Sequence, residues 1–345
     1  MVVGGLTCCD GQYSSQTTCQ PQRNVQLLIY NRVPKAGSTS VLQRVNLTNV
    51  AQGGNVFEML AIHNTDNFKQ SGNRARALSP EWRESMVDYI MSHAEHATAT
   101  RPLFVHGHFL FYDFYRHVQK QGKMPPTTAY MNILRHPVTK LVSHFQYLQS
   151  AFRGSKRARS GLSFDPDVTI DACVSAIAST PPYKPTWEAI PNTTLPCDGT
   201  FFMRAVQWRY FCGYARECLQ ADIEPGLTMA KENLRKHFAF VGLLEETHLT
   251  YRALETLFPT FFARGSGGIS APTDEELEQI ANKNPEKYKT TRATRRYIAA
   301  WAELSGDMDF YHFAASLFWD KITCLIARQW RAGHTLNDLT VLSAD

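Results

Sequence analysis

The stretch VQLLIYNRVPKAGSTSVLQRV, residues 25–45, decides the fold class of this protein. Residues 25–30 form a compact apolar run of strand length, and the apolar spacing of residues 41–45 suits a helix. Residues 34–40, between them, are short, polar and built from small side chains. The order predicts a buried strand, a tight loop and a helix.

Further apolar runs predict more strands of the same sheet. Residues 103–106, 129–134 and 240–244 resemble buried strands, whereas residues 81–96 and 138–152 have the apolar spacing of helices. Strands that alternate with helices favour a parallel sheet with helical crossovers. We therefore expect an α/β fold in which helices flank a central, mostly parallel sheet.

The chain is expected to form one large domain. With 345 residues and 43% hydrophobic composition it can bury a substantial core. We place this domain at residues 25–335, after a disordered leader or stem at 1–24 and before a flexible tail at 336–345. Residues 155–200, rich in Pro, Ser and Thr, are interpreted as an excursion from the core. An apolar stripe at helical spacing near the end is interpreted as core packing: Phe310, Phe313, Leu317 and Cys324.

The charge of the chain argues against a nucleic-acid partner, and its hydropathy bears on membrane-spanning segments within the given sequence. The formal net charge is only +5, so the chain lacks the broad basic excess of proteins that coat nucleic acid. No run of about eighteen apolar residues is present, so the sequence as given predicts no membrane-spanning helix. Any anion must therefore be bound by local clusters of cations.

The loop at residues 34–40 has the chemistry of an anion site. A loop that leaves a buried strand and enters a helix presents backbone N–H groups and the positive helix end, and small residues let a phosphate approach closely. The loop is not a Walker A motif, because Lys35 precedes Gly37 and the leading glycine of that motif is absent. A nucleoside-phosphate kinase is accordingly disfavoured. A plain polar turn with a solvent-exposed lysine stays an alternative for this loop taken alone.

Residues 32–40, RVPKAGSTS, resemble the 5′-phosphosulfate loop of the Golgi sulfotransferases that use 3′-phosphoadenosine 5′-phosphosulfate (PAPS), in particular the heparan sulfate 2-O-sulfotransferases. Other segments support the resemblance in the same order along the chain: 106–108 (HGH), 132–143, 211–218 (FCGYAREC), 240–246 (FVGLLEE) and 289–291 (KTT). The resemblance implies a P-loop-like sulfotransferase fold. It also implies PAPS as co-substrate and no metal.

The implied reaction moves a sulfuryl group from PAPS to the 2-hydroxyl of iduronic or glucuronic acid in heparan sulfate, with a histidine as base. Two alternatives stay open: a uronyl 2-O-sulfotransferase of dermatan or chondroitin sulfate, and an inactive glycan-binding relative. The resemblance further implies a Golgi luminal, type II membrane protein whose anchor lies upstream of this sequence. A homo-oligomer, by resemblance a trimer, is implied as well.

Three side chains are predicted to serve catalysis. Lys35 is expected to neutralise charge at the sulfuryl group and the bridging oxygen. By resemblance, His108 is the base and His106 supports it or positions the acceptor. If the strand at 103–106 continued through Gly107, both rings would share one face, whereas a break there would leave only one in the pocket.

Donor and acceptor contacts are also predicted. Backbone N–H groups of the loop would hold the 5′-phosphate: Ala36, Gly37, Ser38, Thr39 and Ser40. Arg135 and Ser143, eight residues apart, are expected to converge on one anion, by resemblance the 3′-phosphate, and Thr290 belongs to a loop that would close over the nucleotide. Cations for an acidic glycan are Arg32, by resemblance, and a cluster beyond the helix at 138–152: Arg153, Lys156, Arg157 and Arg159.

Of the eight cysteines, four lie close together in the sequence, at 173, 197, 212 and 218, and Cys324 is far from the others. The cluster of four favours disulfides over a zinc site, because no CxxC pair recurs at zinc-ligand spacing. The resemblance implies the pairs Cys173–Cys197 and Cys212–Cys218. Of two sequons, we expect Asn192 to be glycosylated and Asn46 to be unmodified, since a glycan on the helix after the loop would obstruct the site.

Overall fold

The computed structural model describes residues 19–51, 53–54, 56–62, 80–153, 168–178, 206–219, 222–262 and 290–331. Five strands form one parallel sheet in the order β2-β3-β1-β4-β5, so the first strand lies at its centre. Their bounds are β1 Leu27–Asn31, β2 Glu58–Ile62, β3 Leu103–Gly107, β4 Thr128–Leu134 and β5 Phe238–Leu243. The predicted α/β class is confirmed.

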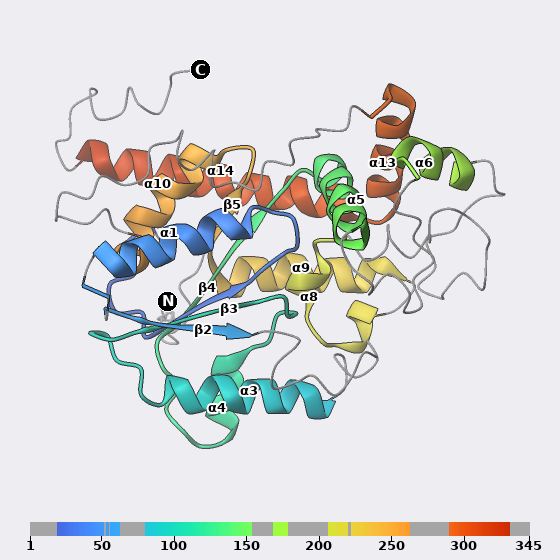
Figure 1. Ribbon diagram of the computed structural model, residues 1–345. Coiled ribbons are helices and arrows are strands. Elements are labelled where there is room, and N and C mark those ends of the chain that lie inside the picture. The colour runs from blue at the N-terminus through green and yellow to red at the C-terminus, as the bar shows by residue number, and fades with distance from the viewer. Residues whose placement is uncertain are drawn as a thin grey trace, which may run out of the picture.

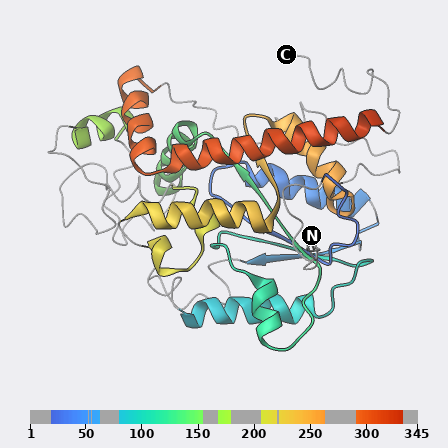
Figure 2. The same ribbon diagram turned by 180° about the vertical axis from the view of Figure 1, so that it is seen from behind.

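Helices cover both faces of the sheet. In Figure 1, α1, α10 and α14 lie on one side of the strands and α3 and α4 on the other, and Figure 2 shows the same layers from behind. Sheet and helices enclose one hydrophobic core. The helices are α1 Ser38–Ala51, α3 Pro80–Ala94, α4 Phe114–Lys120, α5 Pro137–Arg153, α6 Ile170–Ala178, α8 Arg209–Cys212, α9 Ile223–His237, α10 Thr247–Leu257, α11 Pro259–Phe262, α13 Arg292–Leu304 and α14 Asp307–Arg331, with a 3₁₀ turn at Arg216–Leu219.

Four strands were predicted and one was missed. The runs at 25–30, 103–106, 129–134 and 240–244 correspond to β1, β3, β4 and β5, whose residues are all buried. Strands covered on both faces read as continuous apolar runs, which explains the match. The missed strand, β2, lies at the sheet edge and begins with the exposed Glu58, so it lacks such a run.

The chain segments expected to lie outside the domain are described only in part. Cys19 and Gln22 belong to the expected leader, and the backbone N–H of Gln22 donates to the carbonyl of Leu257. The expected excursion at 155–200 is described over 168–178, where it forms α6. The tail at 336–345 lies outside the described residues, and the domain boundaries stay a prediction. None of the described helices is both long and apolar enough to cross a membrane.

Cys324, which is isolated from the other cysteines in the sequence and was assigned no partner, is paired in the structure. Cys324, on α14, forms a disulfide with Cys19, and the two are 305 residues apart in sequence. Arg328, one turn further along α14, donates a hydrogen bond from Nη1 to the carbonyl of Cys19. The start of the described chain is thus attached to the last described helix.

Replacing Cys324 by serine is expected to lower the free energy of unfolding by about 2–5 kcal/mol, because the disulfide closes a very long loop in the unfolded chain. Thermal unfolding without reductant measures the loss. Cys218→Ser is the matched control: its disulfide with Cys212 spans only 6 residues and should contribute less. Equal melting temperatures for wild type and Cys324→Ser would contradict this prediction.

Candidate active site

The loop between β1 and α1 contains two residues with a left-handed backbone conformation. Lys35 has φ +64°, which is uncommon for a residue with a side chain, and Gly37 has φ +82°. A Cβ added at Gly37 would lie 2.6 Å from Cδ1 of Leu244, so the loop packs tightly against the chain that follows β5. α1 begins directly afterwards, at Ser38, and points its positive end at the loop.

Two cations, Lys35 and Arg135, lie close together at this loop. Nη1 of Arg135 donates to the carbonyl of Lys35 at 3.4 Å, while its Nε donates to Oγ1 of Thr139 at 3.2 Å. Nζ of Lys35 lies 4.5 Å from the ring centroid of Tyr147 on α5. Burial lowers the pKa of Lys35, and the charge of Arg135 lowers it further. An anion bound here would offset both effects.

The charge of Arg135 is partly balanced from the end of β5. Burial lowers the pKa of Arg135, and the nearby Glu245 carboxylate opposes that change. Glu245 accepts the backbone N–H of His136 at 2.8 Å and the hydroxyl of Tyr311 at 3.1 Å. The carboxylate therefore holds the turn from β4 into α5 while leaving a net positive charge at the loop.

The structure decides between the two alternatives for the histidines, because β3 ends at Gly107. His106 lies in the strand opposite Tyr30 of β1 and is 7% exposed, whereas His108 follows the strand and is exposed. Of these two histidines, only His108 is thus exposed to solvent at the carboxyl edge of the sheet.

His108 is oriented by the neighbouring strand. The backbone N–H of Arg32 donates to the carbonyl of Gly107 at 2.7 Å, and Nδ1 of His108 lies 2.9 Å from the carbonyl of Arg32. A carbonyl oxygen can only accept, so Nδ1 is the donor and the neutral ring has Nε2 as its basic nitrogen. This tautomer is the one that a general base at Nε2 requires.

Arg32 connects the loop to His108. Its side chain is half-buried, and burial lowers the pKa of the guanidinium. Its Nε is buried and has no hydrogen-bond partner in the described part of the chain. A buried guanidinium donor of this kind favours an anionic ligand, because an unmet charged donor costs free energy.

The other predicted site residues are described in part. Ser143 lies half-buried on α5, two turns after its start, and Thr290, just before α13, accepts a hydrogen bond from Nε of Arg295 at 2.8 Å. Asn46 is exposed on α1. Arg153 ends α5, and its side chain is not described. Four predicted residues lie outside the described residues: Lys156, Arg157, Arg159 and Asn192.

Two of the cysteines implied by the resemblance are joined as expected, Cys212 to Cys218. Cys173 is disulfide-bonded, and Cys197, the partner implied for it, lies outside the described residues.

Sequence reasoning missed Glu245 and Tyr147 as groups of the site. The acidic pair of the segment at 240–246 was a signal for the first, whereas Tyr147 reads as part of an ordinary amphipathic helix.

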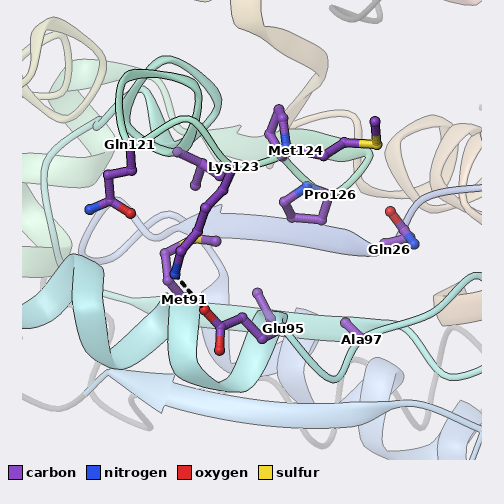
Figure 3. A pocket seen from close by; sticks show the side chains of 11 residues that line it. Gln26, Met91, Glu95, Ala97, Gln121, Lys123, Met124 and Pro126 are labelled. Atoms are coloured by element: carbon purple, nitrogen blue, oxygen red, sulfur yellow. Dashed lines mark hydrogen bonds and ion pairs between the residues drawn. The ribbon is translucent and has the colours of Figure 1, made fainter.

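A separate hollow of about 310 Å³ opens at the other edge of the sheet (Figure 3). Its lining includes Gln26 and Pro126, which precede β1 and β4, and the exposed ion pair between Lys123 and Glu95 at 2.9 Å. It therefore lies at the amino ends of the strands, whereas His108 and the loop lie at the carboxyl ends. In parallel α/β sheets ligands bind outside the carboxyl ends, so this hollow is not the reaction site.

A parallel sheet with an anion-binding loop after its central strand defines a class of α/β proteins that bind phosphate groups. No family model matches the chain. Among curated proteins, heparan sulfate 2-O-sulfotransferase 1 of Xenopus laevis is 29% identical over 322 residues, which cover 86% of this chain and 78% of the relative. Heparan sulfate 2-O-sulfotransferase hst-2 of Caenorhabditis elegans is 27% identical over 309 residues, 87% of this chain and 82% of the relative.

Heparan sulfate 2-O-sulfotransferase 1 of Homo sapiens is 27% identical over 322 residues, with coverage of 86% and 78%. The similarity thus extends over most of each chain. This similarity supports a place for the chain in the heparan sulfate 2-O-sulfotransferase family and a polysaccharide O-sulfotransferase activity.

Gly37→Val is expected to abolish most binding of 3′-phosphoadenosine 5′-phosphate (PAP), because a branched side chain is strained at φ +82° and meets Leu244. Isothermal titration calorimetry measures the affinity. Gly122→Val is the matched control: Gly122 has φ +71°, and nothing lies within 4 Å of an added Cβ. It should lose stability but keep PAP binding. Wild-type affinity in folded Gly37→Val would refute the loop as the phosphate site.

Proposed function

We propose that this enzyme transfers a sulfuryl group from PAPS to the 2-hydroxyl of iduronic or glucuronic acid residues in heparan sulfate. The observation that carries the proposal is the hydrogen bond from His108 to Arg32, because it brings an oriented base to the residue that begins the cationic loop. The names of the relatives support the acceptor.

The donor would be held by the loop and the β4–α5 turn. Backbone N–H groups of residues 36–40 would bind the 5′-phosphate, and Arg135, with Ser143, would bind the 3′-phosphate. The small side chains, the two residues with a left-handed backbone conformation and the two half-buried cations fit a ligand with two phosphate groups. Thr290 would approach the nucleotide from the start of α13.

The transfer step would be an in-line displacement at sulfur. As the sugar oxygen forms its bond to sulfur, the hydroxyl proton passes to Nε2 of His108. The bond between sulfur and the bridging oxygen breaks, and its electron pair stays on that oxygen, where the Lys35 ammonium compensates the charge. The products are the sulfate ester and PAP, and the imidazolium returns its proton to water.

The acidic acceptor would meet cations on the His108 side of the loop. Arg32 is proposed to bind a carboxylate or sulfate of the glycan, since its buried Nε has no partner among the described residues. Arg153, Arg157 and Arg159 are proposed to extend this path. His106, buried in β3, would support the base rather than receive the proton.

Transfer of radiolabelled sulfate from PAPS to heparan sulfate and to dermatan sulfate tests the proposal, with the labelled disaccharides identified. Label at the uronic acid 2-position of heparan sulfate is the expected result. Label on dermatan alone would favour the uronyl 2-O-sulfotransferase alternative. No transfer to either acceptor by folded, PAP-binding protein would favour a glycan-binding relative without activity.

We also propose that the protein works in the Golgi lumen, anchored by a segment upstream of this sequence, as a homo-oligomer such as a trimer. Its disulfides favour an oxidising compartment. A luminal protein should carry an N-glycan at Asn192, so endoglycosidase treatment should increase its gel mobility, and Asn192→Gln should remove that change. Asn46→Gln should not. Light scattering measures the oligomeric state.

A further inference from the structure

The backbone of Arg135 is held by a side chain from a distant part of the sequence. Oε1 of Gln207 accepts the N–H of Arg135 at 3.1 Å, and Nε2 of Gln207 donates to the carbonyl of Arg135 at 2.7 Å. One amide thus satisfies both polar groups of the Arg135 backbone, in the way a neighbouring strand would. Gln207 is fully buried.

The pairing takes place where the sheet ends. Leu134 is the last residue of β4 paired with β5, and its carbonyl accepts the N–H of Leu244 at 2.8 Å. Arg135 follows at once, just beyond the last residue pair of the described β4–β5 ladder. Gln207 therefore continues the backbone pairing by one residue, up to the arginine that faces the loop.

Gln207 is itself fixed in the core. Its backbone N–H donates to Oδ1 of Asp307 at 2.6 Å, and Asp307, the first residue of α14, is buried beside Lys140 of α5. The next residue, Trp208, donates from its indole N–H to the carbonyl of Ser305 at 2.9 Å. These buried hydrogen bonds restrict Gln207 to a single position.

The other end of Arg135 depends on that position. The backbone of Arg135 lies in the turn from β4 into α5, and its guanidinium binds Thr139 and the carbonyl of Lys35. A guanidinium binds phosphate with two directed hydrogen bonds, so a small displacement of its backbone misaligns both. The hydrogen bond to Thr139 alone would hold the guanidinium but would not fix the position of the Arg135 backbone.

We propose that Gln207 is a positioning residue for the donor: by clamping the backbone of Arg135 it sets the guanidinium for the 3′-phosphate and so determines the preference for 3′-phosphorylated nucleotides. This inference rests on the proposed function, in which Arg135 binds that phosphate. Gln207 itself touches no substrate.

The test compares binding of PAP with binding of adenosine 5′-phosphate (AMP), which lacks the 3′-phosphate, by calorimetry. Gln207→Met removes both hydrogen bonds to the Arg135 backbone, together with the side-chain hydrogen bond to Asp307, at similar volume. It is expected to reduce the preference for PAP over AMP about tenfold, with AMP affinity unchanged. Gln207→Glu keeps the acceptor for the Arg135 N–H but can donate to the Arg135 carbonyl only when its carboxyl group is protonated, so it is expected to lose part of the preference.

Asn233→Ala is the matched control. Nδ2 of Asn233 donates to the carbonyls of Phe211 and Cys212, so this variant also loses an amide that binds backbone, but not at Arg135. It should lower the melting temperature and keep the preference for PAP. A melting temperature measured for every variant confirms that each binds as a folded protein.

The outcomes separate the two proposals. If both folded Gln207 variants keep the wild-type preference while Arg135→Ala loses it, the inference about Gln207 is wrong and the proposed donor site stands. If wild type itself does not prefer PAP to AMP, the proposed donor site fails, and the role of Gln207 fails with it.

Discussion

Replacing Lys35 by alanine is expected to reduce the rate of sulfate transfer about 10²–10³-fold, the usual loss when one preorganised charge at the reacting centre is removed. Lys35 is held in the strained turn of the loop, with its ammonium against the ring of Tyr147 and its carbonyl under Arg135. PAP affinity should fall much less, since the loop N–H groups and Arg135 remain. Single-turnover rates and PAP titrations measure the two effects separately.

Two controls isolate the contribution of the charge at that position. Lys35→Arg keeps the charge but replaces a point-like ammonium with a planar guanidinium, so it should recover only part of the rate. Lys123→Ala removes a lysine at the opposite edge of the sheet, where it pairs with Glu95, and should leave the rate unchanged. A Lys35→Ala enzyme that loses PAP binding and transfer to the same extent would contradict a role in the transition state.

Replacing His108 by alanine is expected to reduce the transfer rate about 10²–10⁴-fold, the range for loss of a general acid or base. PAP affinity should stay close to that of wild type, because His108 contacts Arg32 at the side of the loop away from Arg135. Rapid-quench measurement of sulfated heparan gives the rate. His106→Ala should cost less, since that ring is buried in β3.

Two further variants distinguish the base from an orienting group. His108→Asn can still donate to the Arg32 carbonyl, because its amide nitrogen takes the place of Nδ1, but it has no basic nitrogen, so it should be as inactive as His108→Ala. His93→Ala removes a histidine whose Nδ1 lies 2.9 Å from the Tyr89 carbonyl in the same kind of contact, and should be fully active. Recovery of the wild-type rate in His108→Asn would exclude His108 as the base.

Local patterns predicted most of the fold that carries the site. Residues 25–30, 103–106, 129–134 and 240–244 were identified as strands because a parallel strand covered on both faces needs apolar side chains throughout. The edge strand β2 was not predicted, because it begins with the exposed Glu58 and lacks a continuous apolar run. The candidate residues of the loop, Lys35 to Ser40, followed from one continuous stretch of sequence.

Contacts between distant segments could not be predicted in the same way. Cys19 and Cys324 gave no pairing signal at a separation of 305 residues. Gln207 lies in a stretch without a motif, so its clamp on Arg135 had no signature in the sequence. The break of β3 at Gly107, which separates the roles of His106 and His108, was left open by the spacing alone.

The sequence by itself determined the strand–loop–helix unit, the cationic loop and the candidate histidines, because these depend on side chains that are neighbours along the chain. Only the tertiary structure decided that Arg32 orients His108, that Arg135 lies over the loop and that Gln207 holds Arg135. The physical reason is the strand order: β3 and β4 flank β1 on either side, so the ends of three separate segments meet at one edge of the sheet.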